Sequence, residues 1–339
     1  MRPLKLVIDL PAHPAGVAAL RQLGVEVICT EPSSPHPPAH ALDPARAAGA
    51  AGLLCYAAPT NLEELPDLRW IQVSSTGYEQ LLGLNLNERK IRATIARGCC
   101  DPQIAEWNLG MMVNLVRDVP RMIRNQAAAV WDKTPFQGEI RGRTVGFWGY
   151  GGIGRETARL ARQLAMKVHV LTRHGVRPRT DIYAVAGTGD PEGKLPHRVF
   201  TAGQELEFLA GLDFLVLALP LTRASEGVIG ERELRALPRT AYLLNPSRGK
   251  IVQEAALLRA LDEGWFAGAA LDTHHHYPLP PSHPLWRNPR AIVTPHMAGG
   301  GYTPPFAERL WDLLGQNAAR FADGRPLLNE LTPAELAGQ

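Results

Sequence analysis

Gly149-Tyr150-Gly151-Gly152-Ile153-Gly154 is the stretch that decides the fold of this chain, because it joins a strand pattern to a helix pattern. Residues 144–148 before it form a short apolar run typical of a buried strand. Residues 155–164 after it have the periodicity of an amphipathic helix. Glycines in such a loop let the backbone turn tightly, approach a pyrophosphate and aim helix N-terminal amides at it. The stretch predicts a dinucleotide-binding βαβ unit; the alternative is a glycine-rich turn that only joins strand to helix.

Size and composition restrict the classes of protein to consider. A chain of 339 residues predicts about two domains, since one hydrophobic core rarely grows beyond ~250 residues. The net charge of +3 gives no reason to expect a nucleic-acid or membrane partner. No segment approaches the ~20 apolar residues of a membrane span, and the N-terminus reads as a strand instead of a signal peptide. Without C-x-x-C spacing, Cys29, Cys55, Cys99 and Cys100 are expected to be buried, reduced thiols of a cytoplasmic protein.

Two series of β-rich runs predict two parallel α/β sheets. The first series is Leu4–Ile8, Val25–Cys29, Gly52–Tyr56, Leu68–Val73 and Arg92–Ala96. Two helices, Ile104–Arg117 and Val119–Trp131, separate it from a second, larger series. That series is Thr144–Trp148, Lys167–Leu171, His197–Phe200, Asp213–Leu219, Ala241–Leu244, Phe266–Leu271 and Ala291–Thr294. We expect residues 174–196, rich in glycine and proline, to form a loop, and Thr303–Phe321 to form a helix.

Three polar residues follow predicted strands of the second sheet. The carboxyl ends of strands in an open parallel sheet face the ligand crevice. Arg248, in Asn245-Pro-Ser-Arg248-Gly249, is placed to bind a carboxylate with two hydrogen bonds. Asp272 and His296 follow later strands, and a histidine acid–base beside a dinucleotide indicates hydride transfer to a 2-oxo acid. The alternatives are a turn-capping arginine, an ordinary loop carboxylate and a buried structural histidine.

These motifs, in this order, resemble the D-isomer-specific 2-hydroxyacid dehydrogenases over nearly the whole chain. The resemblance implies two Rossmann- or flavodoxin-like doubly wound parallel-sheet domains with the active site in the cleft between them. Residues 104–296 would form the dinucleotide-binding domain, and residues 1–103 with 297–339 the substrate domain. Members of the family are usually homodimers held by their cofactor domains, and Trp107 and Trp131 are the candidates for that interface here.

The resemblance also implies a role for each site residue. Substrate binding falls to Ser75, Thr76, Gly77 and Arg248, and acid–base catalysis to His296. The cofactor contacts fall to Gly149, Gly151, Gly152, Ile153, Gly154, Pro220, Asn245 and Asp272, the last of which meets the nicotinamide amide. The side chain of the substrate is not defined by the sequence, although its pocket is expected to be lined by Tyr56, Ser75, Tyr78, Trp286 and the loop 274–277.

One departure from the pattern of the family concerns the cofactor. A carboxylate normally follows the second strand of the nucleotide-binding unit and binds the ribose 2′-hydroxyl of NAD. Here that strand is followed by Thr172 and Arg173, and the next carboxylate is Asp181. An arginine with a neighbouring hydroxyl favours a 2′-phosphate, with Arg177 or Arg179 nearby. We therefore predict NADP in preference to NAD; the alternative is a solvated loop arginine.

A second departure concerns the acid–base group. The family places a glutamate beside its catalytic histidine, and Tyr277 stands in that position here. A phenol can orient an imidazole but lacks the charge that raises its pKa. We count Tyr277 among the catalytic residues and expect reduction to be favoured at lower pH. One imidazole of His274–His276 is an alternative partner for His296. No C-x-x-C or H-E-x-x-H spacing accompanies these histidines, so no metal site is predicted.

The function indicated is hydride transfer between NADP(H), or NAD(H), and a small 2-oxo or 2-hydroxy acid. Two other readings stay open. One is a relative that uses an unusual hydride donor or acceptor with little proton transfer, as in the formate-dehydrogenase branch, where a neutral side chain replaces the glutamate. The other is a regulatory protein that senses dinucleotides and has weak catalysis. The presence of both Arg248 and His296 favours an enzyme.

Overall fold

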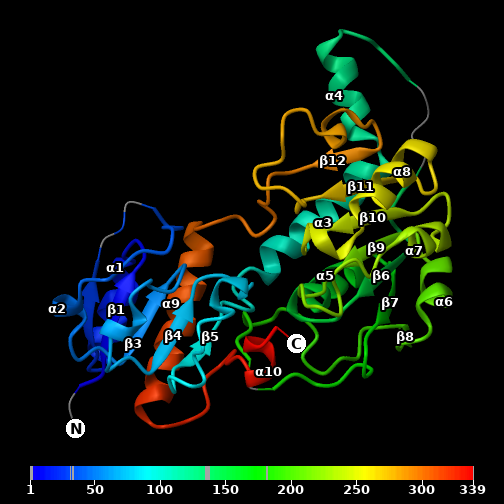
Figure 1. Cartoon of the computed structure of the whole chain (residues 1–339). Coiled ribbons are helices and arrows are strands. Elements are labelled where there is room, and N and C mark those ends of the chain that lie inside the picture. Colours follow the sequence, from blue (N-terminus) through cyan, green and yellow to red (C-terminus); the bar gives the residue numbers. More distant parts are fainter. Residues whose placement is uncertain (1–2, 31, 33, 134–137, 181, 339) are drawn as a thin grey trace. The chain divides into compact units, whose positions relative to one another are not determined.

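The computed structural model describes residues 3–30, 32, 34–133, 138–180 and 182–338. This part of the chain divides into two compact units. Unit 1 comprises the described residues of 1–100, 181–186 and 301–339, and unit 2 those of 101–180 and 187–300. Each unit is a parallel sheet with helices on both faces (Figure 1), which confirms the predicted fold class.

Unit 1 is built on a five-stranded parallel sheet of order β2-β1-β3-β4-β5 among its described residues. The strands are β1 (Lys5–Asp9), β2 (Glu26–Cys29), β3 (Gly52–Cys55), β4 (Trp70–Val73) and β5 (Arg92–Thr94). Apolar side chains of α1 (Pro14–Gln22) and α9 (Pro304–Ala322) cover one face. The other face packs against α2 (Pro44–Ala47) and the 3₁₀ turns η1 (Leu62–Glu64) and η2 (Glu79–Leu81). Strands buried on both faces explain the near-continuous apolar runs in the sequence.

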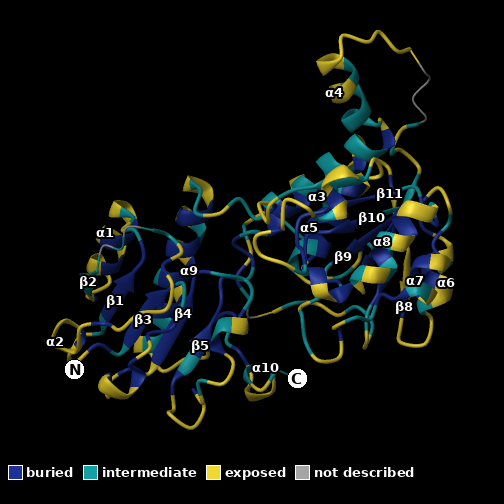
Figure 2. Cartoon of the chain, turned by 45° about the horizontal axis from the view of Figure 1, so that its top comes forward, coloured by how far each residue is buried: buried dark blue, intermediate teal, exposed yellow. Residues whose placement is uncertain are grey.

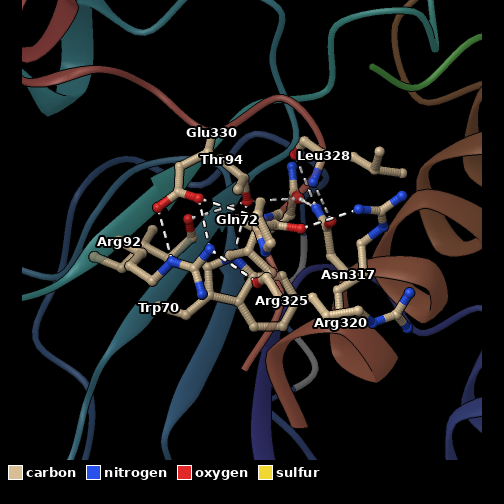
Figure 3. Close-up of polar contacts among 12 residues, drawn as sticks. Trp70, Gln72, Arg92, Thr94, Asn317, Arg320, Arg325, Leu328 and Glu330 are labelled. Atoms are coloured by element: carbon tan, nitrogen blue, oxygen red, sulfur yellow. Dashed lines mark hydrogen bonds and ion pairs between the residues drawn. The ribbon is translucent and has the colours of Figure 1, made fainter. Parts of the chain in front are cut away.

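A buried polar network ties the C-terminal segment to the sheet of unit 1 (Figure 3). Asn317 of α9 donates to Gln72 Oε1 (3.2 Å) and accepts from the Leu328 amide (2.7 Å). Thr94 Oγ1 also donates to Gln72 Oε1 (2.7 Å). Because buried polar groups are costly unless they are hydrogen-bonded, these bonds select one position for α9 on β4 and β5. The short helix α10 (Pro333–Leu336) follows near the end of the chain.

Unit 2 holds a seven-stranded parallel sheet, of order β12-β11-β10-β9-β6-β7-β8 within the described residues. Its strands are β6 (Thr144–Trp148), β7 (Lys167–Leu171), β8 (Arg198–Phe200), β9 (Phe214–Leu217), β10 (Tyr242–Asn245), β11 (Gly268–Leu271) and β12 (Ala291–Val293). One face packs against α3 (Asp101–Val116) and α5 (Gly152–Gln163). The other packs against α6 (Glu205–Ala210), α7 (Glu231–Ala236) and α8 (Glu254–Glu263). Figure 2 shows the strands of this sheet as the buried layer of the unit.

Helix α4 (Val119–Ala127) is the exception to this packing. It has no buried residue and projects from the rest of unit 2 in both views (Figures 1 and 2). It ends four residues before the predicted end at Trp131, because the backbone leaves the helix and reaches φ 53° at Ala129. Trp131 itself is 86% exposed.

The unit boundaries and the burial of two cysteines differ in detail from the sequence-based expectations. Unit 2 begins at residue 101 and ends at residue 300, and residues 182–186 belong to unit 1, where Tyr183 joins the apolar cluster of α1 and α9. This differs from the predicted boundaries at 103/104 and 296/297, because the predicted loop 174–196 sends one segment into the core of unit 1. Cys55 and Cys99 are buried as expected, whereas Cys29 and Cys100 are half-buried. No described helix has both the length and the apolar composition needed to span a bilayer.

Candidate active site

The predicted cofactor and acid–base residues all lie at the carboxyl edge of the sheet of unit 2. The glycine loop follows β6, and Thr172 with Arg173 follows β7. Pro220 follows β9, where its carbonyl accepts a hydrogen bond from Ser225 Oγ (2.7 Å). The remaining residues follow the next strands of the sheet: Asn245 and Arg248 after β10, Asp272 with Tyr277 after β11, and His296 after β12. The topology thus brings together residues that are far apart in sequence.

The glycine loop has the conformation that an anion site requires. Gly149 has φ 94°, and a Cβ at this position would lie 2.5 Å from the Ala218 carbonyl oxygen, so a larger residue is excluded. Gly151 is the N-cap of α5, and space around it is open where a Cβ would stand. Gly151 brings no side-chain cap of its own to α5. The N-terminus of a helix favours a phosphate, because its first-turn amides have no partner within the helix.

Asp101, at the start of α3, lies beside the glycine loop. No motif of the sequence pointed to this residue. Its carboxylate lies where a Cβ of residue 152 would stand, so only glycine fits at Gly152. Asp101 is 8% exposed. Gly152 therefore serves helix–helix packing, and α3 and α5 approach each other closely at their N-termini.

The end of β7 supports the predicted preference for a 2′-phosphate. Arg173 is exposed and makes no hydrogen bond or ion pair with any described residue. The hydroxyl of Thr172 is buried and has no hydrogen-bond partner in the described chain. A carboxylate that could bind a ribose 2′-hydroxyl is absent from positions 172 and 173. The guanidinium of Arg173 thus remains available to a phosphate.

Arg155 anchors the loop that follows Arg173, a role that the sequence did not reveal. Its guanidinium donates to the carbonyl oxygens of Tyr150 (3.2 Å), Arg177 (2.6 Å) and Asp190. Tyr150 in turn donates its hydroxyl to Asp190 Oδ2 (2.8 Å). Burial and the Asp190 carboxylate raise the pKa of Tyr150, and burial lowers the pKa of Arg155. This network holds the long loop beside the glycine motif, although Arg155 looks like a surface residue in the helical pattern.

Arg248 is held by a compact turn after β10. The side chain of Asn245 bridges this turn, because it accepts from the Ser247 amide (3.1 Å) and donates to the Arg248 carbonyl oxygen (3.0 Å). Arg248 Nη1 donates to the Ser247 carbonyl oxygen (2.8 Å), and the side chain is half-buried. These bonds do not test the prediction that Asn245 binds the cofactor. They show that the Asn245 side chain also supports the turn that carries Arg248.

Asp272 supports the loop that carries His296. Its Oδ1 accepts from Thr294 Oγ1 (2.5 Å) and from the Met297 amide (2.8 Å), and its Oδ2 accepts from the Ala298 amide (2.9 Å). Its main-chain oxygen accepts from the His296 amide (2.8 Å). Asp272 is 0% exposed. Its predicted contact with the nicotinamide amide stays a prediction, and its observed bonds are made to the segment 294–298 that carries His296.

These bonds hold His296 in an uncommon conformation. His296 has φ 54°, in the left-handed region that residues other than glycine rarely adopt. The backbone there is stabilised on both sides, by the His296 amide bond to Asp272 and by the Asp272 carboxylate bonds to the next two amides. The imidazole is exposed, as a proton donor to a ligand must be.

Tyr277 lies beside His296, as the sequence predicted. The two ring centroids are 5.5 Å apart at an interplanar angle of 56°. The phenol oxygen accepts from the His274 amide (3.2 Å). His274 Nε2 donates to the Thr294 carbonyl oxygen (2.9 Å), so this imidazole is directed at the backbone of the His296 loop. His275 donates to the Val252 carbonyl oxygen (2.8 Å). Of these side chains, Tyr277 has the ring contact with His296.

The predicted carboxylate-binding loop lies in unit 1, after β4. Ser75 Oγ donates to the Gly77 carbonyl oxygen (2.7 Å) and accepts from Gln80 Nε2 (2.7 Å), which fixes the loop. Among the described residues, the amides of Thr76 and Gly77 donate to no acceptor. Two adjacent amides of this kind suit an anion.

The chain is similar in sequence and in fold to known 2-hydroxyacid dehydrogenases. A family model described as the NAD binding domain of D-isomer specific 2-hydroxyacid dehydrogenases matches residues 109–298. A glyoxylate reductase of Thermofilum pendens is 30% identical over 278 residues, which cover 80% of this chain and 76% of that protein. A D-isomer specific 2-hydroxyacid dehydrogenase family protein from Aeromonas salmonicida has a solved structure with a TM-score of 0.78 and 25% identity, covering 97% of this chain and 99% of that one. An NADPH-dependent glyoxylate/hydroxypyruvate reductase from Sinorhizobium meliloti shares the fold, with a TM-score of 0.76 and 24% identity over 99% and 100% of the chains.

Proposed function

Because the chain belongs to the D-isomer specific 2-hydroxyacid dehydrogenase family of NAD(P)-dependent oxidoreductases, we propose that it reduces a small 2-oxo acid with NADPH. The observation that carries the proposal is the grouping of the glycine loop, Arg248 and His296 at the carboxyl edge of one sheet. Beside a dinucleotide, the reaction needs a cation that binds the substrate carboxylate and a group that donates a proton. Arg248 and His296 are the residues of these two kinds. The reverse oxidation of a 2-hydroxy acid would use the same groups.

The residues of unit 2 fit a dinucleotide. The N-terminus of α5 and the open space at Gly151 suit a pyrophosphate. We assign Ile153, Pro220 and Asn245 to the remaining cofactor contacts. The bound dinucleotide supplies the hydride, and the residues around it orient the substrate and provide the proton.

We propose NADP as the preferred cofactor. Arg173 is exposed and has no described partner, so a 2′-phosphate would gain a charge-assisted hydrogen bond there without breaking another. NAD lacks this 2′-phosphate, so Arg173 would make no such contact with NAD. The absence of a carboxylate at positions 172 and 173 also removes the usual means of preferring NAD.

Arg248 binds the carboxylate of the substrate, since its guanidinium matches that group in geometry and charge. The amides of Thr76 and Gly77 are proposed as additional carboxylate donors, and Ser75 as the residue that fixes their loop. His296 donates a proton to the carbonyl oxygen as the hydride arrives at the carbon. Tyr277 orients the imidazole by ring contact and adds no charge.

We also propose that the protein forms a homodimer through α4 and the neighbouring part of α3. On α4, Ile123 is 60% exposed, and Trp131 beyond it is 86% exposed. A short helix without buried residues is marginal alone, because most helical stability comes from packing. Trp107 of α3 is half-buried, and we keep it as a second candidate for the interface. Sedimentation analysis of wild type and Ile123→Glu tests this assignment.

The function is tested by initial rates with NADPH and a panel of 2-oxo acids from glyoxylate to aryl pyruvates. The proposal expects turnover of at least one member, and its loss in Arg248→Ala with NADPH binding retained. Tight NADPH binding without turnover of any 2-oxo acid would refute the proposed reaction and favour a dinucleotide sensor. Oxidation of formate without reduction of any 2-oxo acid would favour an enzyme like the formate-dehydrogenase branch, whose reaction needs little proton transfer.

A further inference from the structure

Glu254, His276 and His283 bring three metal-ligating side chains together in unit 2, and of the three only His276 belongs to the loop 274–277 that is expected to line the substrate pocket. His283 Nε2 lies 3.2 Å from Glu254 Oε1, and His276 Nε2 lies 3.6 Å from Glu254 Oε2. One ligand atom from each of the three residues can be chosen so that all lie within 4.8 Å of one another. In a tetrahedral zinc site with bonds of about 2.0–2.1 Å, ligand atoms are separated by about 3.3 Å. The cluster therefore needs only small side-chain movements to enclose an ion.

Each ligand is supplied by a different part of unit 2. Glu254 is the first residue of α8, and His283 is the N-cap residue of the 3₁₀ turn η4 (Pro284–Arg287). The side chain of His283 is 9% exposed and that of Glu254 is 28% exposed, so both are held by their surroundings. The side chain of His276, at 54% exposed, leaves the cluster accessible from solvent.

We propose that Glu254, His276 and His283 form a binding site for a divalent transition metal of the Zn²⁺ type, with a fourth position open to water. Two imidazoles and one carboxylate match the preferences of zinc and of its first-row neighbours. Mg²⁺ and Ca²⁺ prefer oxygen ligands and are not expected to bind here. No step of the proposed reduction reaction uses this ion.

The hydrogen bonds of His283 set the affinity. Its Nδ1 accepts from the Leu285 amide (3.3 Å), so the proton of the neutral ring is on Nε2 and points to Glu254. A metal ion at Nε2 replaces that proton, which moves to Nδ1, and the bond from Leu285 is broken. This rearrangement opposes binding. The site is therefore weaker than a closed zinc site with four protein ligands.

An occupied site would link two segments close to the loop that carries His296. His276 precedes Tyr277, whose ring contacts His296, whereas Glu254 begins α8. The metal would thus fasten the segment 276–283 to α8. Because an ion that binds only the folded state stabilises it, the Tm of the protein should rise with zinc concentration.

The experiment uses the full-length, untagged protein freed of metal with a chelator. Calorimetric titration with Zn²⁺ should give one site, and Co²⁺ should give the visible absorption of a tetrahedral nitrogen–oxygen complex. His283→Ala and Glu254→Gln should each weaken zinc binding by about 100-fold or more, since even second-shell changes cost 10–100-fold. His40→Ala is the matched control, because His40 is also an exposed histidine beside a carboxylate, 3.5 Å from Asp9, and should leave binding unchanged.

His276→Ala changes the exposed member of the cluster and should keep the metal-free Tm while it weakens binding. It therefore separates loss of a ligand from loss of folding. The proposal is overturned if wild type shows neither a zinc isotherm nor the Co²⁺ spectrum. It is also overturned if the cluster variants bind zinc as tightly as His40→Ala. Saturation of the site by Mg²⁺ would contradict the ligand assignment.

Discussion

Replacement of Asp272 by asparagine should release the His296 loop while leaving cofactor binding largely intact. The carboxylate accepts hydrogen bonds from Thr294 Oγ1, the Met297 amide and the Ala298 amide at 2.5–2.9 Å and is fully buried. Asparagine keeps one acceptor oxygen for Thr294 Oγ1 and the Met297 amide. It places an amide nitrogen, which cannot accept, opposite the Ala298 amide. Hydrogen bonds to a charged group contribute about 1.5–3 kcal/mol each. Loss of one bond and weakening of the others, offset by easier burial of a neutral group, should lower the free energy of unfolding by about 3 kcal/mol.

The released loop should also reduce turnover. His296 is held at φ 54°, which costs about 1–2 kcal/mol for a residue other than glycine, so weaker support allows the backbone to relax. A displacement of about 1 Å at a reacting group costs about 100-fold in rate. Thr294→Val removes a single donor and should lower the unfolding free energy by about 2 kcal/mol, with a smaller loss of kcat.

The assay combines denaturant unfolding, kcat with an active 2-oxo acid, and NADPH titration by fluorescence. Asp272→Asn should lose stability and kcat together, and its Kd for NADPH should stay within about threefold of wild type. Thr294→Ser, which keeps the hydroxyl, should restore both quantities relative to Thr294→Val. A large rise in the Kd for NADPH at unchanged stability would refute this reasoning and make Asp272 chiefly a cofactor ligand.

Three other substitutions test the remaining assignments. Arg248→Lys should lower kcat/KM for the 2-oxo acid by about 100-fold, because lysine lacks the two-point contact with a carboxylate; an equal loss of NADPH affinity would contradict the role. Arg173→Ser should raise the KM for NADPH about 10–100-fold, equivalent to one charge-assisted bond, and leave that for NADH unchanged; equal effects on both would exclude a 2′-phosphate contact. Tyr277→Glu should move the fall in reduction rate to higher pH, since a carboxylate raises the pKa of a neighbouring imidazole; an unshifted pH–rate profile would show that the residue does not act on His296.

Local sequence patterns were sufficient to predict most of the fold. Apolar runs of four to seven residues between helical segments correspond to the observed strands, because parallel strands are buried on both faces. The glycine loop and the polar residues after successive strands then locate the carboxyl edge of the sheet. Prolines at positions 304 and 305 mark the start of α9 correctly, since proline fits the first turn of a helix.

What the sequence did not reveal depends on the direction of side chains and on long-range packing. Arg155 falls on an amphipathic helix, and no local pattern indicates that it anchors a loop through Asp190. The association of Glu254 with His283 depends on how the loop after β11 returns to α8. Tyr183 joins the core of unit 1 from within a segment whose glycine and proline content indicates only a surface loop. The ring contact of Tyr277 with His296 was predicted from the resemblance to the family, which supplied the long-range information.

The central claim is that this chain transfers a hydride from a nicotinamide cofactor to the carbonyl carbon of a 2-oxo acid. The most direct measurement uses NADPH deuterated at the transferable position and follows the product by mass spectrometry and chiral separation. The account predicts a D-2-hydroxy acid that carries deuterium at the 2-carbon, formed by wild type and not by Arg248→Ala. A product without deuterium, or the absence of product at saturating NADPH across the panel of 2-oxo acids, would contradict it.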